Sequence, residues 1–193
     1  MTDSERMALR ARQLGAELLS TLPLRWSHVR AVAVRAEDLS ADLDATERHV
    51  VVAAAWLHDI GYADELAVTG FHAVDGAKHL VRLAWPASVC GLVAFHTGAM
   101  YEAQERGMPE ELSPFELPAP HLLDTLTAAD VSVGPDGDRV DPQQRIAEIL
   151  DRYDEADPVH RAVRRSAPEL LAAVERTERR LAAAGTPSRT QPM

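Results

Sequence analysis

The stretch that decides the fold runs Ala53-Ala54-Ala55-Trp56-Leu57-His58-Asp59-Ile60-Gly61. It closes the most hydrophobic segment of the chain, and two polar side chains, His58 and Asp59, come near its end. If the segment is a helix, a carboxylate at its C-terminal end opposes the helix dipole and loses hydration in the core. A divalent cation would remove both penalties. An arginine partner for Asp59 and a hydrogen-bonded core histidine at position 58 would also explain the pair.

Hydrophobic periodicity predicts an all-α protein. Apolar residues recur mostly at spacings of three and four, and alternation with a period of two is nearly absent. We expect a bundle of about seven to eight helices. They are predicted near residues 5–20, 23–38, 45–60, 71–83, 87–97, 120–132, 142–152 and 167–184. A single domain over residues 1–185 and a disordered tail over residues 186–193 complete the expected organisation.

Helix-capping patterns support several of these boundaries. Asp44 followed by Glu47 resembles a capping box at the start of the third helix, and Gly61 is placed to end that helix in a left-handed conformation. A second capping box is predicted at Ser166, at the start of the last helix. The longest irregular segment is 98–120, and such a segment is a lid, a binding loop or a plain surface connection.

Composition narrows the classes of function. The 193 residues carry a formal net charge of −10 and one cysteine, Cys90. The negative charge disfavours binding of a nucleic acid polymer, and a single cysteine excludes an intrachain disulfide and a cysteine-rich zinc site. The N-terminal segment is charged and no apolar run is long enough to cross a membrane, so we expect a cytoplasmic protein with no membrane association. The sequence allows a homo-oligomer.

Further histidines and aspartates fall on the apolar faces of other predicted helices. His96 and Asp130 each end an apolar stripe near the C-terminus of a predicted helix, and His28 lies on the apolar face of the second helix. His72 begins a helix in which Gly76 would let a backbone or a ligand approach closely. Imidazole and carboxylate groups together suit one or two Fe, Mn, Co, Ni or Zn ions better than calcium. The remaining histidines are given no ligand role: His49, His79, His121 and His160.

The order of these residues resembles the H…HD…H…H…D pattern of the HD-domain superfamily of metal-dependent phosphohydrolases and their relatives. The matching residues are His28, His58, Asp59, His72, His96 and Asp130, and the resemblance covers residues from near 20 to near 135. It implies a first metal held by His28, His58, Asp59 and Asp130. It also implies that Asp59 bridges to a second metal, which His72 and His96 hold as well.

The chain departs from the family pattern at two positions. Phe95 stands where members often have a histidine before His96, which removes one potential ligand of the second metal. Tyr62 stands where many relatives have a lysine, which removes a cation that could assist phosphate chemistry. Segments 58–61 and 71–77 look most like the bacterial branch that includes the HD-GYP cyclic-dinucleotide phosphodiesterases. The Gly-Tyr-Pro signature is missing, so that activity is not transferred.

The resemblance implies hydrolysis of a small phosphate ester or nucleotide. A divalent metal would lower the pKa of a bound water toward about 7, and Asp59 or Asp130 could orient the hydroxide as catalytic residues. Lys78 and Arg82 follow His72 on the same predicted helix and could reach a substrate phosphate. The same residue set is similar to that of HD-fold di-iron oxygenases, which cleave a carbon–carbon or carbon–phosphorus bond with O₂. A non-catalytic metal-binding or nucleotide-binding sensor is the third hypothesis.

Overall fold

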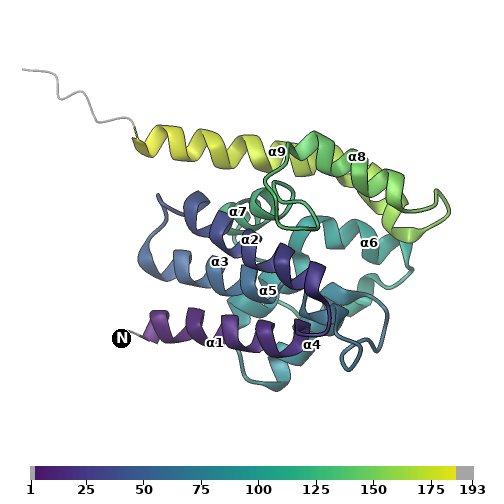
Figure 1. The fold of residues 1–193 in the computed structure, drawn as a ribbon, viewed down its shortest axis with the longest axis horizontal. Coiled ribbons are helices and arrows are strands. Elements are labelled where there is room, and N and C mark those ends of the chain that lie inside the picture. The colour runs from purple at the N-terminus through teal and green to yellow at the C-terminus, as the bar shows by residue number, and fades with distance from the viewer. Residues whose placement is uncertain (1–2, 186–193) are drawn as a thin grey trace, which may run out of the picture.

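The computed structural model describes residues 3–185, which form helices and short connections (Figure 1). Within that range the nine α-helices are α1 (Asp3–Leu19), α2 (Pro23–Leu39), α3 (Ala45–Leu57), α4 (His72–Arg82), α5 (Ala87–Phe95), α6 (Ala99–Glu105), α7 (Pro120–Asp130), α8 (Pro142–Arg152) and α9 (Pro158–Gly185). Three short 3-10 helices are η1 (Ile60–Tyr62), η2 (His96–Gly98) and η3 (Pro109–Leu112). The predicted all-α fold is confirmed. The tail expected at 186–193 lies outside the described residues.

Helix α3 is the centre of the bundle. It contacts α1, α2, α5 and α7, and its buried residues are Val50, Val51, Val52, Ala53, Ala54, Ala55 and Leu57. A helix covered by neighbours on several sides has no polar face, which explains its continuous hydrophobic sequence. Asp44 caps the start of α3 as predicted, since its side chain accepts hydrogen bonds from the backbone of Thr46 and Glu47. Gly15 lets α1 cross closely, because a Cβ there would lie 2.6 Å from the Trp56 carbonyl oxygen.

The C-terminal end of α3 differs from the expected glycine stop. The chain continues from α3 into η1, and Gly61 does not adopt a left-handed conformation. Glycine is required there for another reason, because a Cβ on Gly61 would lie 1.9 Å from the His72 carbonyl oxygen. Gly76 accepts the same close approach, since a Cβ on it would lie 3.1 Å from the Gly61 nitrogen. The two glycines therefore allow the segment after α3 to pack directly against α4. The close backbone approach predicted at Gly76 is confirmed.

Two elements in the C-terminal half differ from the predicted helices. Helix α6 and η3 occupy part of the segment 98–120, which the sequence analysis left irregular. Helix α9 begins at Pro158, not near residue 167, so Ser166 is interior and its hydroxyl bonds a carbonyl oxygen one turn earlier. The capping box predicted at Ser166 is wrong. A run of charged residues obscured the helical period, in which the buried Ala162, Ser166 and Leu170 recur at intervals of four.

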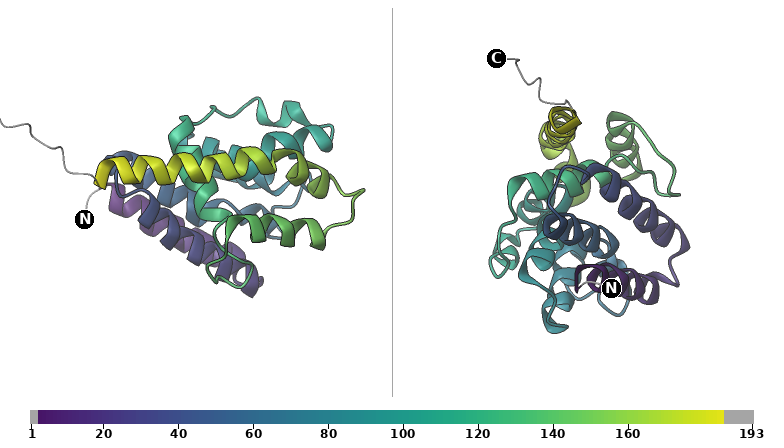
Figure 2. Two further views of the ribbon diagram at one scale, coloured as in Figure 1. Left: turned by 90° about the horizontal axis from the view of Figure 1, so that it is seen from above. Right: turned by 90° about the vertical axis from the view of Figure 1, so that its left-hand side faces the viewer.

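Helix α9 runs along one side of the bundle, with α8 next to it (Figure 2). It packs on α6, α7 and α8, and it therefore ties the last third of the chain to the helices that precede it. None of the helices in residues 3–185 combines the length and the apolar content of a membrane span.

Candidate metal centre

Six side chains that the sequence analysis singled out converge where several helices end. His28 belongs to α2, whereas the others lie at helix termini. His58 and Asp59 follow α3, His72 begins α4, His96 follows α5 and Asp130 ends α7. All six are buried except His72, whose side chain is 15% exposed. The fold therefore gathers the predicted ligands at one place.

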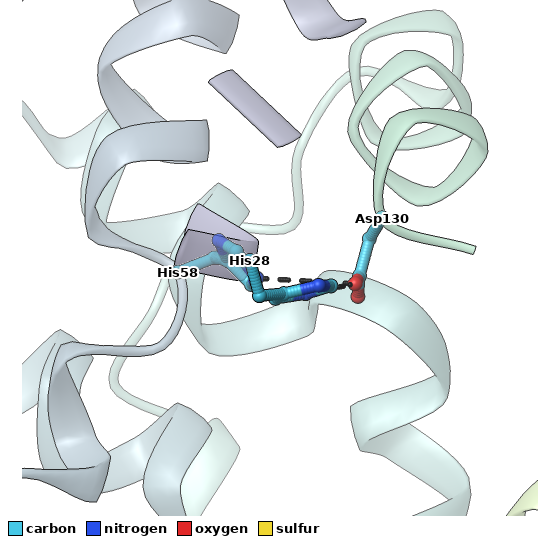
Figure 3. Close-up of side chains that lie close together, drawn as sticks. All are labelled: His28, His58 and Asp130. Carbon is cyan, nitrogen blue, oxygen red and sulfur yellow. Dashed lines mark hydrogen bonds and ion pairs between the residues drawn. The ribbon is translucent and has the colours of Figure 1, made fainter. Parts of the chain in front are cut away.

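The six residues form two sets, and the ligand atoms of each set lie within 4.8 Å of one another. The first set is His28, His58 and Asp130, and the second set is Asp59, His72 and His96. In the first set, Asp130 Oδ1 lies 3.0 Å from His28 Nε2 and 3.9 Å from His58 Nε2 (Figure 3). Each set offers imidazole nitrogen and carboxylate oxygen, the donor types that suit a transition metal.

Asp59 faces both sets. Its Oδ1 lies 3.6 Å from His72 Nε2 and 3.9 Å from His96 Nε2 in the second set. Its Oδ2 lies 3.5 Å from His58 Nε2 in the first set. One carboxylate thus presents separate oxygens to the two sets, which is the arrangement that a bridging ligand needs.

The histidine rings are oriented with Nε2 toward the centre. Nδ1 of His28, His58 and His96 lies 3.0, 2.8 and 2.6 Å, respectively, from a backbone carbonyl oxygen. A carbonyl oxygen only accepts hydrogen bonds, so Nδ1 carries a proton in all three rings, and Nε2 of the neutral His58 ring offers a lone pair. His58 Nε2 is fully buried and has no hydrogen-bond partner. A metal ion fits this set, because lone pairs and carboxylates that face one another need a cation between them.

Burial and neighbouring charges set the protonation of these groups. Burial lowers the pKa of His58, and it lowers the pKa of His72 to about 3, so both rings are neutral at pH 7. At His28, burial is outweighed by the hydrogen bond and charge of Asp130, which raise the pKa. Burial acts to raise the pKa values of Asp59 and Asp130, but the charge of Arg25 holds the pKa of Asp59 below the usual range, and the hydrogen bond from His28 does the same for Asp130. Two ionised carboxylates therefore share a buried centre that attracts positive charge.

Arg25 belongs to this centre and was missed by the sequence analysis. Its Nη1 donates a hydrogen bond to Asp59 Oδ2 at 2.7 Å, and its guanidinium lies 4.0 Å from the centroid of the Tyr62 ring. Tyr62 in turn stacks on His72, with ring centroids 4.2 Å apart. Arg25 thus provides a cation near the position where many relatives have lysine. Its spacing of three residues before His28 places both on one face of α2, and this spacing could have identified it.

Thr97 holds Asp130 from a strained backbone conformation. Its φ of 42° and ψ of 53° are rare for a β-branched residue. The Thr97 hydroxyl donates to Asp130 Oδ2, while the other carboxylate oxygen faces His28. Such strain persists where the surrounding structure requires it, often at a functional site. The sequence analysis extended the fifth helix to residue 97 and so missed the turn that carries both His96 and this donor.

All of the six candidate ligands except the fully buried His58 line one cavity, together with residues of the α8–α9 region. The lining residues from that region are Arg145, Ile149, Arg152, Tyr153, Val159 and Val163. Lys78 and Arg82, expected to bind substrate, are not among the lining residues. Lys78 pairs with Glu111, and Arg82 is exposed. The reason is helix geometry, because these residues follow His72 by about 240° and about 280° of rotation around α4.

The residues given no ligand role lie elsewhere. Phe95 lines a separate apolar hollow with Met100, Leu112 and Phe115, so it does not face the two sets. The remaining histidines lie outside both sets: His49, His79, His121 and His160. His121, for example, pairs with Glu47 at 2.8 Å.

The fold and the two sets define an all-α protein whose centre could hold one or two divalent metal ions. The family model of the HD domain matches residues 25–156, which is more than half of the chain. The chain therefore belongs to the HD-domain family, within the superfamily of metal-dependent phosphohydrolases. Comparison with curated proteins and with solved structures finds no match.

We expect each set to bind one metal ion, and we expect a variant of one set to lose its ion while the other set keeps its own. His58→Ala should remove the ion of the first set and His96→Ala that of the second, because each leaves an incomplete set. Asp59→Ala should lower both occupancies, since its carboxylate faces both sets. Elemental analysis of the purified variants measures the metal content per chain. His49→Ala is the control and should retain the wild-type content, and equal metal in all four variants would contradict the assignment.

The Thr97 hydroxyl should strengthen metal binding by the first set. Thr97→Val keeps the β-branched shape but removes the donor to Asp130, and we expect roughly tenfold to hundredfold weaker metal affinity. Thr97→Ser keeps the hydroxyl and should bind nearly as the wild type does. Titration against a fluorescent chelator measures both affinities. Wild-type affinity in Thr97→Val would mean that Asp130 is oriented without this bond.

Proposed function

We propose that this protein hydrolyses a small phosphate ester or nucleotide with one or two divalent metal ions. The observation that supports it most strongly is the pair of ligand sets, joined by Asp59, beside Arg25 in one cavity. The net charge of −10 repels anions on average, including nucleic acid polymers, so a phosphate substrate needs local cations that reverse the field. Arg25 and bound metal ions would provide them.

A divalent ion in this centre would act as a Lewis acid and lower the pKa of water toward about 7. The residues of the chain would then orient the reactants. Asp59 and Asp130 are ionised, so each can accept a hydrogen bond from the attacking water and direct it at the phosphorus atom. Thr97 and Arg25 each hold one oxygen of these carboxylates in place. Arg25 would also neutralise charge on the phosphoryl oxygens, as a guanidinium does well.

A di-iron oxygenase is the second candidate, and one observation favours it. The second set, Asp59, His72 and His96, is assembled even though position 95 carries phenylalanine. An oxygenase of this kind requires both ions, whereas a hydrolase can work with one. The two functions differ in their metal requirement, because an oxygenase passes electrons from iron to O₂ and a hydrolase needs no change of oxidation state.

If the protein is a hydrolase, it should turn over substrate with a metal that does not change oxidation state. Metal-free protein reconstituted with Mn²⁺ under anaerobic conditions should release inorganic phosphate or a nucleoside monophosphate from at least one member of a phosphoester panel. Asp59→Ala should lose this activity, because it removes a ligand and a catalytic carboxylate. His49→Ala, whose side chain lies outside the centre, should retain it. Phosphate release measured by a colorimetric assay and nucleotides measured by chromatography provide the readout.

The opposite pattern would support the oxygenase. Substrate-dependent O₂ uptake with iron alone, together with no phosphate release under any metal, would contradict the hydrolase. Binding of metal or nucleotide without turnover in either assay would support the sensor.

A further inference from the structure

Helix α8 carries two arginines on the face that lines the cavity. Arg145 and Arg152 are seven residues apart, which places them on the same side of the helix, and both line the cavity that contains the metal ligands. Glu148 lies between them and pairs with Nη1 of Arg145 and Nη2 of Arg152. Two guanidinium groups therefore share one carboxylate, and the three side chains together keep a net positive charge.

Arg145 has a hydrogen-bond donor that no residue in the described range 3–185 uses. It is 6% exposed, although arginine is rarely buried without full pairing. Its Nε is buried without a hydrogen-bond partner, while its Nη1 is occupied by Glu148. A buried charged donor without a partner is costly, and an anionic ligand in the cavity would satisfy it.

Arg152 extends this positive surface beyond the cavity of the metal ligands and is exposed. It lines the main cavity and also an adjoining hollow formed with Leu24, Arg25, His28 and Pro135. Arg25, His28 and Arg152 line both spaces, so Arg152 lies beside residues of the metal centre. Apolar side chains of Ile149, Val159 and Val163 lie in the same cavity lining.

We infer that Arg145 and Arg152 form a second anion-binding subsite, and that the substrate carries two anionic groups. One group, the scissile phosphate, lies at the metal ligands and Arg25. The other, a second phosphate or a carboxylate, lies against the α8 arginines, and a partly apolar linker between the groups contacts Ile149. This inference rests on the proposed function only in placing the scissile phosphate at the metal ligands.

Equilibrium binding tests the subsite without requiring turnover. The probes are alkane bisphosphonates of increasing chain length, each compared with the alkyl monophosphonate of the same chain length by calorimetric titration of the purified protein. At one chain length, the bisphosphonate should bind roughly tenfold to a hundredfold more tightly, as expected for an added charged hydrogen bond. Bis-carboxylates of that length then show whether the second group is better matched by a carboxylate.

Variants of the exposed arginines connect this preference to α8. Arg152→Gln should reduce the ratio of the two affinities to near one, and Arg152→Lys should restore part of it. Arg164→Gln, on the exposed face of α9, should keep the wild-type ratio. Melting curves establish that each variant folds, and metal analysis after titration establishes that the probes leave the ions in place.

Two outcomes overturn the inference. One is a ratio near one at every chain length in the wild type, and the other is a preference that Arg152→Gln does not change. Failure of the phosphoester panel with an intact bisphosphonate preference would reject the hydrolase and leave the subsite standing. Turnover of simple monoesters without any bisphosphonate preference would support the hydrolase and reject the subsite.

Discussion

The Asp59 carboxylate is buried at 3% exposure, shortly after the apolar run 50–57 of α3, where the negative end of the α3 dipole adds to its own charge. The free energy needed to bury an isolated charge in such a place exceeds the free energy of unfolding of a typical domain. The surrounding structure supplies a positive partner on Oδ2 and imidazole nitrogens near both carboxylate oxygens. Arg25 lies 2.7 Å from Oδ2, and the histidine nitrogens of the two sets lie where a metal ion would join them to the carboxylate.

The other helices are arranged to meet this requirement. Helices α3, α5 and α7 all direct their C-terminal ends to the centre, where His58, His96 and Asp130 lie, and the partial negative charge of a helix C-terminus favours a cation. Gly61 and Gly76 allow η1 and α4 to touch, which carries His72 to Asp59. The strained turn at Thr97 and the cover provided by α8 and α9 complete the centre.

Sequence reasoning predicted what depends on local patterns and on residue chemistry. The helical period identified the bundle. The six His and Asp residues were singled out as candidate ligands because polar groups recurred on apolar faces, and the structure brings these six together. Arg25 was missed because a surface-type residue near a ligand carries no distinctive pattern, and Arg145 because its approach to the cavity depends on how α8 folds back over the bundle. Lys78 and Arg82 were placed by proximity in sequence, whereas rotation around α4 turns them away. The start of α9 was misplaced because charges interrupted its apolar stripe.

When metal is bound, Asp59 would hold two ions in one buried centre, because its oxygens face both sets. Electron paramagnetic resonance of protein loaded with Mn²⁺ tests it most directly, because two ions that share a carboxylate couple magnetically. With both sets filled, the spectrum should show an exchange-coupled Mn²⁺ pair, and His96→Ala should convert it to the hyperfine pattern of an isolated ion. The spectrum of isolated Mn²⁺ in the fully loaded wild type would contradict the account.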